Sequence, residues 1–330
     1  MSQDKPVTIL NALNAAMMDA MADDDMVITL GEDCGDPEGG GVMGVTNGLS
    51  TRFGDHRCRS TPISEQAIMG AAIGASLIGF KPVAEIMLMN FTTVAMDMIV
   101  NHAAKLRYMS GGQTNVPIVI RTMTGAGISA GGQHSDFVEA WFAHTAGMKV
   151  VAPSTPEDAY GLLRAAIDDP DPVLVIENTP NYSAKGPAPV SGHRVPIGKA
   201  AIRSEGSDVT IVAYSRTAIE AVAALPAMTE AGISAEVIDL RSIQPWDEQA
   251  VLASVAKTGR CLVVHEAVTP FGPGAEIAAV VQERLFGKLK APVMRFGAPF
   301  NAVPFSKVLE DAHIPKAARI AERAIAMVKG

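Results

Sequence analysis

Glu65 stands where a carboxyl group could share a proton with the ring nitrogen of a bound molecule. It follows a proline and Ser64, a pattern that predicts a helix start with Ser64 as its N-cap. Ile63, Ile68 and Met69 would surround the carboxyl group with apolar side chains, which raise its affinity for a proton. The helix dipole also favours an acidic residue in any first turn, and taken alone this ordinary interpretation is the more frequent one.

His134 is the second candidate for chemistry. It lies in Gly132-Gln133-His134-Ser135, on a loop predicted to follow a strand and the flexible stretch 125–127. An imidazole titrates near neutral pH, so His134 could pass a proton to or from a substrate. A single histidine on a loop is more often an ordinary surface or hydrogen-bonding residue.

Other sequence patterns exclude several classes of site. The glycine-rich stretch 39–44 lacks the Lys-Ser/Thr of a P-loop, which indicates a mobile loop rather than a phosphate cradle. His265 and Glu266 have no second histidine at the spacing of a zinc-protease helix, so they are expected to be structural. No Gly-x-Ser-x-Gly nucleophile elbow is present. The three cysteines, Cys34, Cys58 and Cys261, are expected to be reduced thiols.

Composition narrows the class of protein further. The 330 residues are 48% hydrophobic and 19% charged, which is typical of a globular protein with a large core. The net charge of −8 and the absence of a basic cluster argue against nucleic acid as a partner. No secretory signal is evident, and the apolar stretch 71–80 is too short to span a bilayer. We therefore expect a cytoplasmic protein without a membrane partner.

Alternating β-branched runs and Ala-rich stretches predict an α/β fold with two doubly wound parallel-sheet domains. We expect domains at 1–185 and 208–330, joined by a proline-rich linker at 186–207. In the first domain, strands are predicted at 26–30, 83–88, 116–123, 149–152 and 173–177. Helices are predicted at 7–22, with Thr8 as its cap, at 65–79, at 92–108 and after Pro156. In the second, strands are predicted at 209–214, 235–240, 261–265 and 293–296, and helices at 218–231, 247–256, 274–286 and from Lys316.

Several separated stretches together resemble one protein family, the β subunits of the 2-oxo acid dehydrogenase E1 components of the pyruvate, branched-chain and acetoin types. The stretches follow the family order along almost the whole chain: 30–33, 61–65, 84–87, 105–112, 133–135, 147–151, 237–241, 257–260 and 309–315. The resemblance implies a transketolase pyrimidine-binding domain followed by a transketolase C-terminal-like domain. It also makes the functional interpretations of Glu65 and His134 the favoured ones.

The resemblance implies a role for each site residue. Glu65 resembles the glutamate that contacts N1′ of thiamine diphosphate, where a shared proton favours the imino form that deprotonates C2. His134 resembles a histidine of the active-site channel that donates protons during acyl transfer to a lipoyl group. Met87 and Phe91 match positions that pack against the aminopyrimidine ring, although ordinary core positions would look the same. Glu32 is expected at the cofactor as well.

The family also implies a potassium site. Ile118, Ala166, Ile167, Asp169 and Asp171 fall where the family holds a structural K⁺. Carbonyl oxygens with one or two carboxylates suit such a weakly hydrated ion. The acidic stretch 168–171 could equally be a solvated turn, so both interpretations stay open.

The absence of any Gly-Asp-Gly stretch bears on the partners. Proteins that hold thiamine diphosphate alone use this stretch to ligate Mg²⁺ on the diphosphate, and this sequence has none. The metal ligands must therefore come from another chain, which the resemblance identifies as the E1 α subunit of an α2β2 heterotetramer. An E2 lipoyl acyltransferase is the second expected partner.

The sequence narrows the choice of substrate but does not decide it. The stretches 41–46, 120–127 and 303–306 are most similar to the acetoin-cleaving subgroup, whereas 239–246 is closer to branched-chain enzymes, and pyruvate stays open. A self-contained transketolase-like enzyme is disfavoured because the diphosphate-binding region is missing. A non-catalytic scaffold or regulatory paralogue would require the loss of Glu65 or His134, and both are present.

Overall fold

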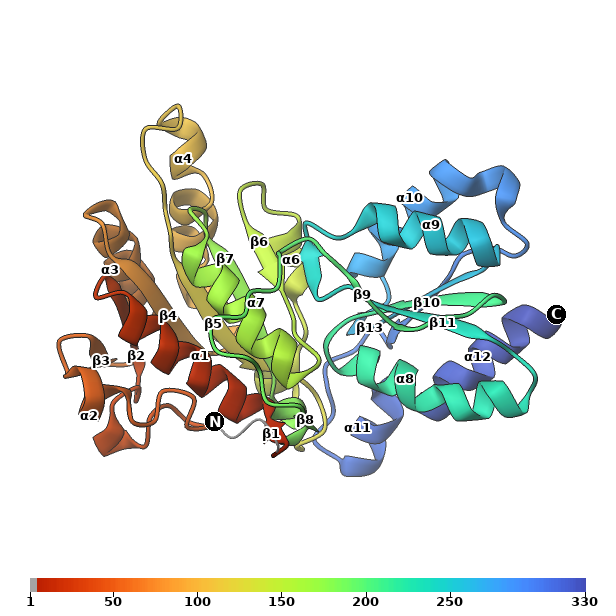
Figure 1. Cartoon of the computed structure of the whole chain (residues 1–330), viewed down its shortest axis with the longest axis horizontal. Coiled ribbons are helices and arrows are strands. Elements are labelled where there is room, and N and C mark those ends of the chain that lie inside the picture. Colours follow the sequence, from red (N-terminus) through yellow and green to blue (C-terminus); the bar gives the residue numbers. More distant parts are fainter. Residues whose placement is uncertain (1–4) are drawn as a thin grey trace. The chain divides into compact units, whose positions relative to one another are not determined.

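The computed structural model describes residues 5–330, which form two compact units (Figure 1). The first comprises the chain up to Thr124 together with Trp141–Ile197. The second comprises Gly125–Ala140 together with Gly198–Gly330. The passage at Ile197 lies within the stretch expected to link two domains. A short segment from the first half of the chain, Gly125–Ala140, therefore groups with the second unit.

The first unit is built on parallel strands. In spatial order β6-β7-β5-β4-β2-β3, every neighbouring pair is parallel. The strands are β2 (Val27–Glu32), β3 (Cys58–Thr61), β4 (Lys81–Leu88), β5 (Val119–Thr124), β6 (Lys149–Val151) and β7 (Val173–Asn178). A separate antiparallel pair joins β1 (Val7–Thr8) to β8 (Lys185–Gly186).

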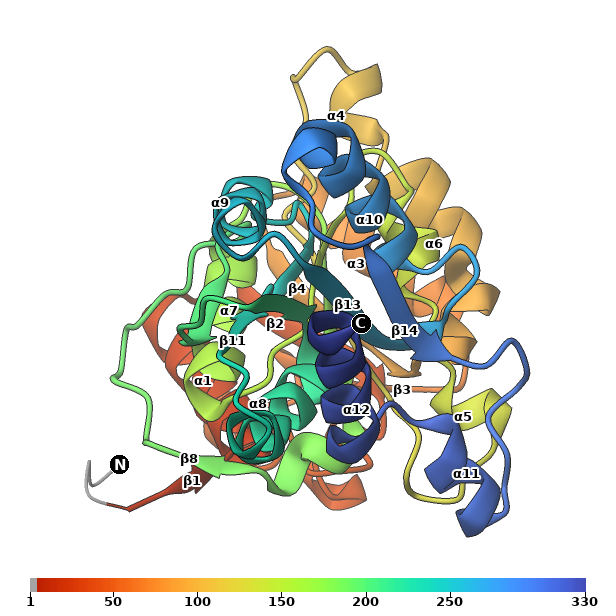
Figure 2. The ribbon, with the colours of Figure 1, turned by 90° about the vertical axis from the view of Figure 1, so that its right-hand side faces the viewer.

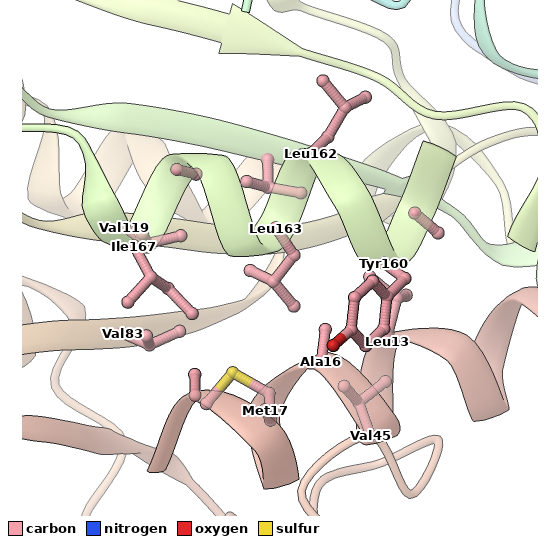
Figure 3. Packing of buried hydrophobic residues seen from close by; sticks show 14 of the residues in the cluster. Leu13, Ala16, Met17, Val45, Val83, Val119, Tyr160, Leu162, Leu163 and Ile167 are labelled. Carbon is pink, nitrogen blue, oxygen red and sulfur yellow. The ribbon is translucent and has the colours of Figure 1, made fainter. Parts of the chain in front are cut away.

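Two helices pack together to form the core on one face of this sheet, α1 (Ile9–Asp23) and α7 (Pro156–Asp168). Figure 3 shows Leu13 and Met17 of α1 facing Leu163 of α7, all three fully buried. The predicted cap of the first helix is confirmed, because Thr8 Oγ1 accepts the backbone N–H of Asn11 at 3.1 Å.

The single helix predicted at 92–108 is wrong. The chain there forms a 3₁₀-helix (Met89–Ala95), a π-helix (Met98–Ala103) and the short α4 (Leu106–Met109). The hydroxyl groups of Thr92 and Thr93 donate to the carbonyl oxygens three residues earlier, at 2.6 and 2.8 Å. Such local bonds compete with regular α-helix, which explains why the apolar pattern was misleading. Helices α2 (Leu49–Phe53) and α3 (Glu65–Leu77) precede this region.

The second unit holds a smaller sheet in the order β14-β13-β10-β11-β9, parallel except for the edge strand β9. Its strands are β9 (Ala201–Ser204), β10 (Val209–Ala213), β11 (Ala235–Asp239), β13 (Cys261–Val268) and β14 (Met294–Ala298). The short strand β12 (Ser242–Gln244) is not part of this sheet. The predicted α/β class with mostly parallel sheets is confirmed.

Helices cover this second sheet, and Figure 2 shows α12 alongside α8. They are α8 (Ser215–Glu230), α9 (Glu248–Thr258), α10 (Pro273–Leu285), α11 (Lys307–His313) and α12 (Ala317–Lys329). The short helices α5 (Gly132–Ser135) and α6 (Glu139–Ala143) belong to the middle of the chain, and short 3₁₀-helices lie at Asp36–Glu38, Thr179–Ser183 and Phe286–Lys288. Across residues 5–330, every helix is too short or too polar to cross a bilayer.

Candidate active site

The carboxyl ends of β2 and β4 form a topological switch point of the first sheet. The chain leaves β2 toward β3 on one side, and leaves β4 toward β5 on the other. Ligands of open α/β sheets bind in the crevice that opens where neighbouring strands diverge in this way. Glu32 ends β2, and Met87 is the penultimate residue of β4. Two expected site residues thus lie at the position that the topology favours.

Glu65 begins α3, the helix that follows β3, and its side chain is partly exposed. The apolar surroundings predicted for it are only partly present, since Ile68 and Met69 are buried whereas Ile63 is 75% exposed. Ser64 takes the N-cap position, as predicted, although its side chain makes no capping hydrogen bond. The fully apolar surroundings expected for Glu65 are therefore not present.

At this end of the sheet, the charges of nearby carboxylates affect the pKa of Glu32. Burial raises the pKa of Glu32, and the charges of Asp33, Glu65 and Glu85 raise it further. Burial likewise raises the pKa of Glu85. A carboxyl group close to other carboxylates holds its proton more tightly. Such a group is a candidate for sharing a proton with a ligand nitrogen.

A buried ion-pair network lies beside these glutamates, and the sequence analysis missed it. The Arg121 guanidinium donates from Nε and Nη2 to the two carboxylate oxygens of Glu177, at 2.7 and 2.8 Å. Its Nη1 donates to Glu85 Oε2 at 2.7 Å, and Tyr182 Oη donates to Glu177 at 2.6 Å. Burial works to lower the pKa of Arg121, but Glu177 and Glu85 raise it, so the guanidinium stays charged.

This network carried a sequence signal that was overlooked. Glu85, Arg121 and Glu177 each interrupt an otherwise apolar predicted strand, and charged residues are rarely buried unless they are paired. Glu85 and Arg121 are direct partners in the register of β4 and β5. Three charged residues in three apolar strands could therefore have predicted an internal ion-pair cluster.

A small pocket opens onto the network and contains about 240 Å³ of empty space. Its wall is formed by Gly41, Met43, Val45, Glu85, Met87, Arg121, Thr122, Met123, Glu177 and Tyr182. Met87 thus lines this pocket, and its contact with a cofactor ring stays a prediction. Phe91 is half-buried in the 3₁₀-helix after β4 and is not part of the wall.

His134 lies on α5 and is exposed, and it belongs to the second unit. Its neighbour Ser135 is buried, so the short helix presents one side to the interior and His134 to solvent. Exposure of His134 is what both interpretations require, an ordinary surface residue and a proton donor to a ligand.

The residues expected to hold potassium lie near one another, but their carboxylates have other partners. Lys149 Nζ donates to both oxygens of Asp169, at 2.6 and 2.8 Å, and lies 3.3 Å from Asp171. Arg107 binds the other oxygen of Asp171. The carbonyl oxygen of Ile118 accepts the N–H of Val173 at 3.0 Å.

Backbone carbonyls each carry two lone pairs, so those of Ile118, Ala166 and Ile167 keep a free acceptor site for an ion. The carboxylates of Asp169 and Asp171, in contrast, are neutralised by the chain's own cations. The potassium site stays a prediction, with carbonyl oxygens as its main ligands.

The described part of the chain offers no cluster of side chains for a divalent metal ion. Residues 5–330 contain no group of three or more His, Cys, Asp or Glu side chains arranged to hold a metal ion. This agrees with the lack of a Gly-Asp-Gly stretch.

Comparison with known proteins explains this arrangement. Residues 5–185 match the family model of the transketolase pyrimidine binding domain, and residues 198–320 match the transketolase C-terminal domain. The acetoin:2,6-dichlorophenolindophenol oxidoreductase subunit beta of Cupriavidus necator is 44% identical, over 99% of this chain and 98% of that protein. The chain belongs to the E1 β-subunit family. The resemblance inferred from the sequence motifs is thereby confirmed.

Other members of the E1 β-subunit family differ in their named substrates. The 3-methyl-2-oxobutanoate dehydrogenase subunit beta of Mycobacterium tuberculosis is 43% identical over 92% of this chain and 87% of that protein. The pyruvate dehydrogenase E1 component subunit beta-2 of Oryza sativa is 43% identical over 94% of this chain and 84% of that protein. A solved structure titled split gene transketolase, inactive beta4 tetramer, matches with a TM-score of 0.78 at 21% identity, over 98% of this chain and 100% of that one.

Proposed function

We propose that this chain is the β subunit of a thiamine-diphosphate-dependent E1 component that cleaves acetoin and passes the acyl fragment to an E2 lipoyl group. Decarboxylation of pyruvate or of a branched 2-oxo acid is the alternative. The observation that carries the proposal is the place of Glu32 and Met87 at the switch point, where burial and nearby carboxylates raise the pKa of Glu32, in a chain whose described residues offer no divalent metal site.

The chain supplies the ring half of the cofactor site. Thiamine diphosphate, when bound, supplies a reactive thiazolium carbon that adds to the substrate carbonyl. Glu65 would hold a proton at the pyrimidine N1′, and Glu32, whose pKa is raised by burial and by nearby carboxylates, would lie at the cofactor as well. Met87 and Phe91 would pack against the ring and exclude water. His134 would donate a proton at the substrate or lipoyl group.

A second chain must complete the site. A diphosphate carries several negative charges, and the glutamates here would repel it unless Mg²⁺ intervenes. The α subunit of an α2β2 heterotetramer would provide the metal ligands. The pocket beside the network is also smaller than most small-molecule sites.

The acetoin subgroup is favoured by residues 41–46, 120–127 and 303–306, and by the similarity to the Cupriavidus protein over nearly the full length of both chains. A cytoplasmic location and the docking of E2 stay predictions. The substrate is tested by purifying the chain with its α partner and measuring dye reduction with acetoin, pyruvate and branched 2-oxo acids in parallel. Acetoin should be turned over fastest, and a clear preference for pyruvate would favour the alternative.

The role of Glu65 is tested by Glu65→Gln in the assembled protein. Because the amide cannot share a proton in the same way, exchange of the cofactor C2 proton for deuterium should fall by at least about a thousandfold, a general-base effect at the upper end of the usual range. Glu276→Gln, at an exposed position of α10, serves as the matched control. Assembly with the α chain should be unchanged in both. Near-normal exchange in Glu65→Gln would refute the proposed contact.

A further inference from the structure

The loop before His134 has backbone N–H groups that find no hydrogen-bond acceptors within the loop itself. Between residues 125 and 131, Gly125, Gly127, Ser129 and Gly131 all have positive φ, at 112°, 126°, 57° and 75°. Such a conformation allows no regular helix or strand pairing, so its N–H groups need other acceptors. The loop groups with the second unit, and the acceptors are found there.

Glu310 of α11 supplies most of them. Its side chain is fully buried, and its carboxylate accepts the backbone N–H of Gly127 at 2.6 Å. Both carboxylate oxygens lie 3.1 Å from the backbone nitrogen of Ser129, and the Ser129 hydroxyl donates to one of them at 3.4 Å. Hydrogen bonds to an ionised carboxylate are about twice as strong as neutral ones. The carboxylate of Glu310 thus holds the loop backbone at both Gly127 and Ser129.

Arg216 and Glu266 hold Ala126, the residue directly before Gly127. Arg216 Nη1 donates to the carbonyl oxygen of Ala126, and the N–H of Ala126 donates to Glu266 Oε1 at 3.3 Å. The Ala126 side chain is buried in a small apolar cluster with Val303 and Ile314. Both polar backbone groups and the side chain of Ala126 are therefore fixed.

The residues directly before His134 also lie against the C-terminal segment. A Cβ atom added to Gly131 would lie 2.4 Å from the Phe305 ring, and one added to Gly132 would lie 3.1 Å from Ala302 Cβ. Figure 2 shows α5 and α11 close together at the lower right. The start of α5, and with it the position of His134, is defined by the C-terminal part of the second unit.

From these contacts we propose that Glu310, supported by Arg216, is a positioning residue for His134. The proposal rests on the catalytic role proposed for that histidine. Glu310 does not touch the reacting atoms. It fixes the backbone of residues 125–131, and this fixes the point from which the imidazole reaches the substrate. The second unit thereby contributes to the chemistry and not only to assembly.

Glu310→Gln tests the proposal in the protein assembled with its α partner. The amide group lacks the charge, and its NH₂ would face the N–H of Gly127 or Ser129 instead of accepting it. Amide hydrogen exchange at Gly127 and Ser129 should accelerate roughly tenfold to a hundredfold, the effect of losing hydrogen bonds to a charged group. Glu276→Gln should leave this exchange unchanged.

A double-mutant cycle with His134→Asn separates positioning from general stabilisation. Glu310→Gln should lower kcat about tenfold or more with little change in KM, and it should cause no further loss when His134 is already Asn. Glu310→Asp, which keeps the charge on a shorter side chain, should recover part of kcat. If Glu310→Gln does not assemble, Arg216→Met replaces it in the same cycle, because Arg216 is partly exposed and is expected to be better tolerated.

The outcomes distinguish this proposal from the one on which it rests. Normal turnover of His134→Asn would remove the histidine from the mechanism and would overturn both proposals. A slow His134→Asn variant combined with a fully additive loss from Glu310→Gln would overturn only the positioning role. Unchanged loop exchange and unchanged kcat in Glu310→Gln would do the same.

Discussion

Arg121 binds Glu177 through two parallel hydrogen bonds inside the first unit, where both side chains are almost completely buried. Removing one partner of such a pair leaves the other charge buried without compensation. We therefore expect Arg121→Met to lower the free energy of unfolding by roughly 3–5 kcal/mol, although methionine fills much of the same volume. Denaturant unfolding of the purified chain measures this difference.

Arg59→Met is the matched control for Arg121→Met, because Arg59 is an exposed residue of β3. Surface substitutions usually change the free energy of unfolding by about 0.5 kcal/mol or less. Equal stability of Arg121→Met and Arg59→Met would mean that the network is not an important part of the core.

Glu139 should make the stability of the chain depend on pH. Its side chain is fully buried, and burial raises its pKa from 4.5 to about 7 despite the hydrogen bond that Tyr214 donates to it. Between these two values the folded chain keeps a proton that the unfolded chain has lost. Stability is therefore highest below pH 4.5, as far as this group is concerned, and it falls as the pH rises to about 7.

The expected loss is about 3 kcal/mol, since each pKa unit corresponds to about 1.4 kcal/mol. Glu139→Gln cannot titrate, so the variant should gain stability relative to the natural chain between pH 5 and pH 8 by this amount. Denaturant unfolding of both proteins at the two pH values gives the comparison. Glu276→Gln should show no such gain, and parallel pH profiles for Glu139→Gln and the natural chain would contradict the prediction.

The parts of the fold that follow from local pattern were predictable from the sequence. Thr8 at the start of α1 and the apolar strands of both sheets were found because capping and periodicity act within a few residues. The helix expected at 92–108 failed because the Thr92 and Thr93 hydroxyl groups bond locally to the backbone. Hydrophobic periodicity does not contain that information.

The site was predictable only in its separate residues. Glu65 and Glu32 could be named from their motifs, but the register of three strands is needed to bring Arg121 to Glu85 and Glu177. Glu310 was missed because it binds residues more than 180 positions earlier, and no local pattern marks such a contact. Long-range hydrogen bonds to an irregular loop have no periodic signature.

Potassium should stabilise the chain through backbone carbonyl oxygens. A ligand that binds only the folded state raises the melting temperature, and the increase grows with the ligand concentration relative to its dissociation constant. We expect a higher melting temperature in KCl than in NaCl of the same ionic strength. In Lys149→Met the difference should grow, because the ammonium group that now neutralises Asp169 is gone. Identical melting temperatures in the two salts, for both proteins, would argue for an ordinary solvated turn at 168–171.

Purified without an α partner, the chain should bind thiamine diphosphate only negligibly. The described residues provide no divalent metal site, and the charges of Glu32, Glu65 and Glu85 oppose the approach of a diphosphate. Titration calorimetry with Mg²⁺ present should therefore give no measurable heat at micromolar concentrations, whereas the assembled protein should bind. Thiamine without its diphosphate is the matched control ligand, because it lacks the repelled group. A micromolar dissociation constant for the isolated chain would show that it holds the whole cofactor, and the two-chain site would then be wrong.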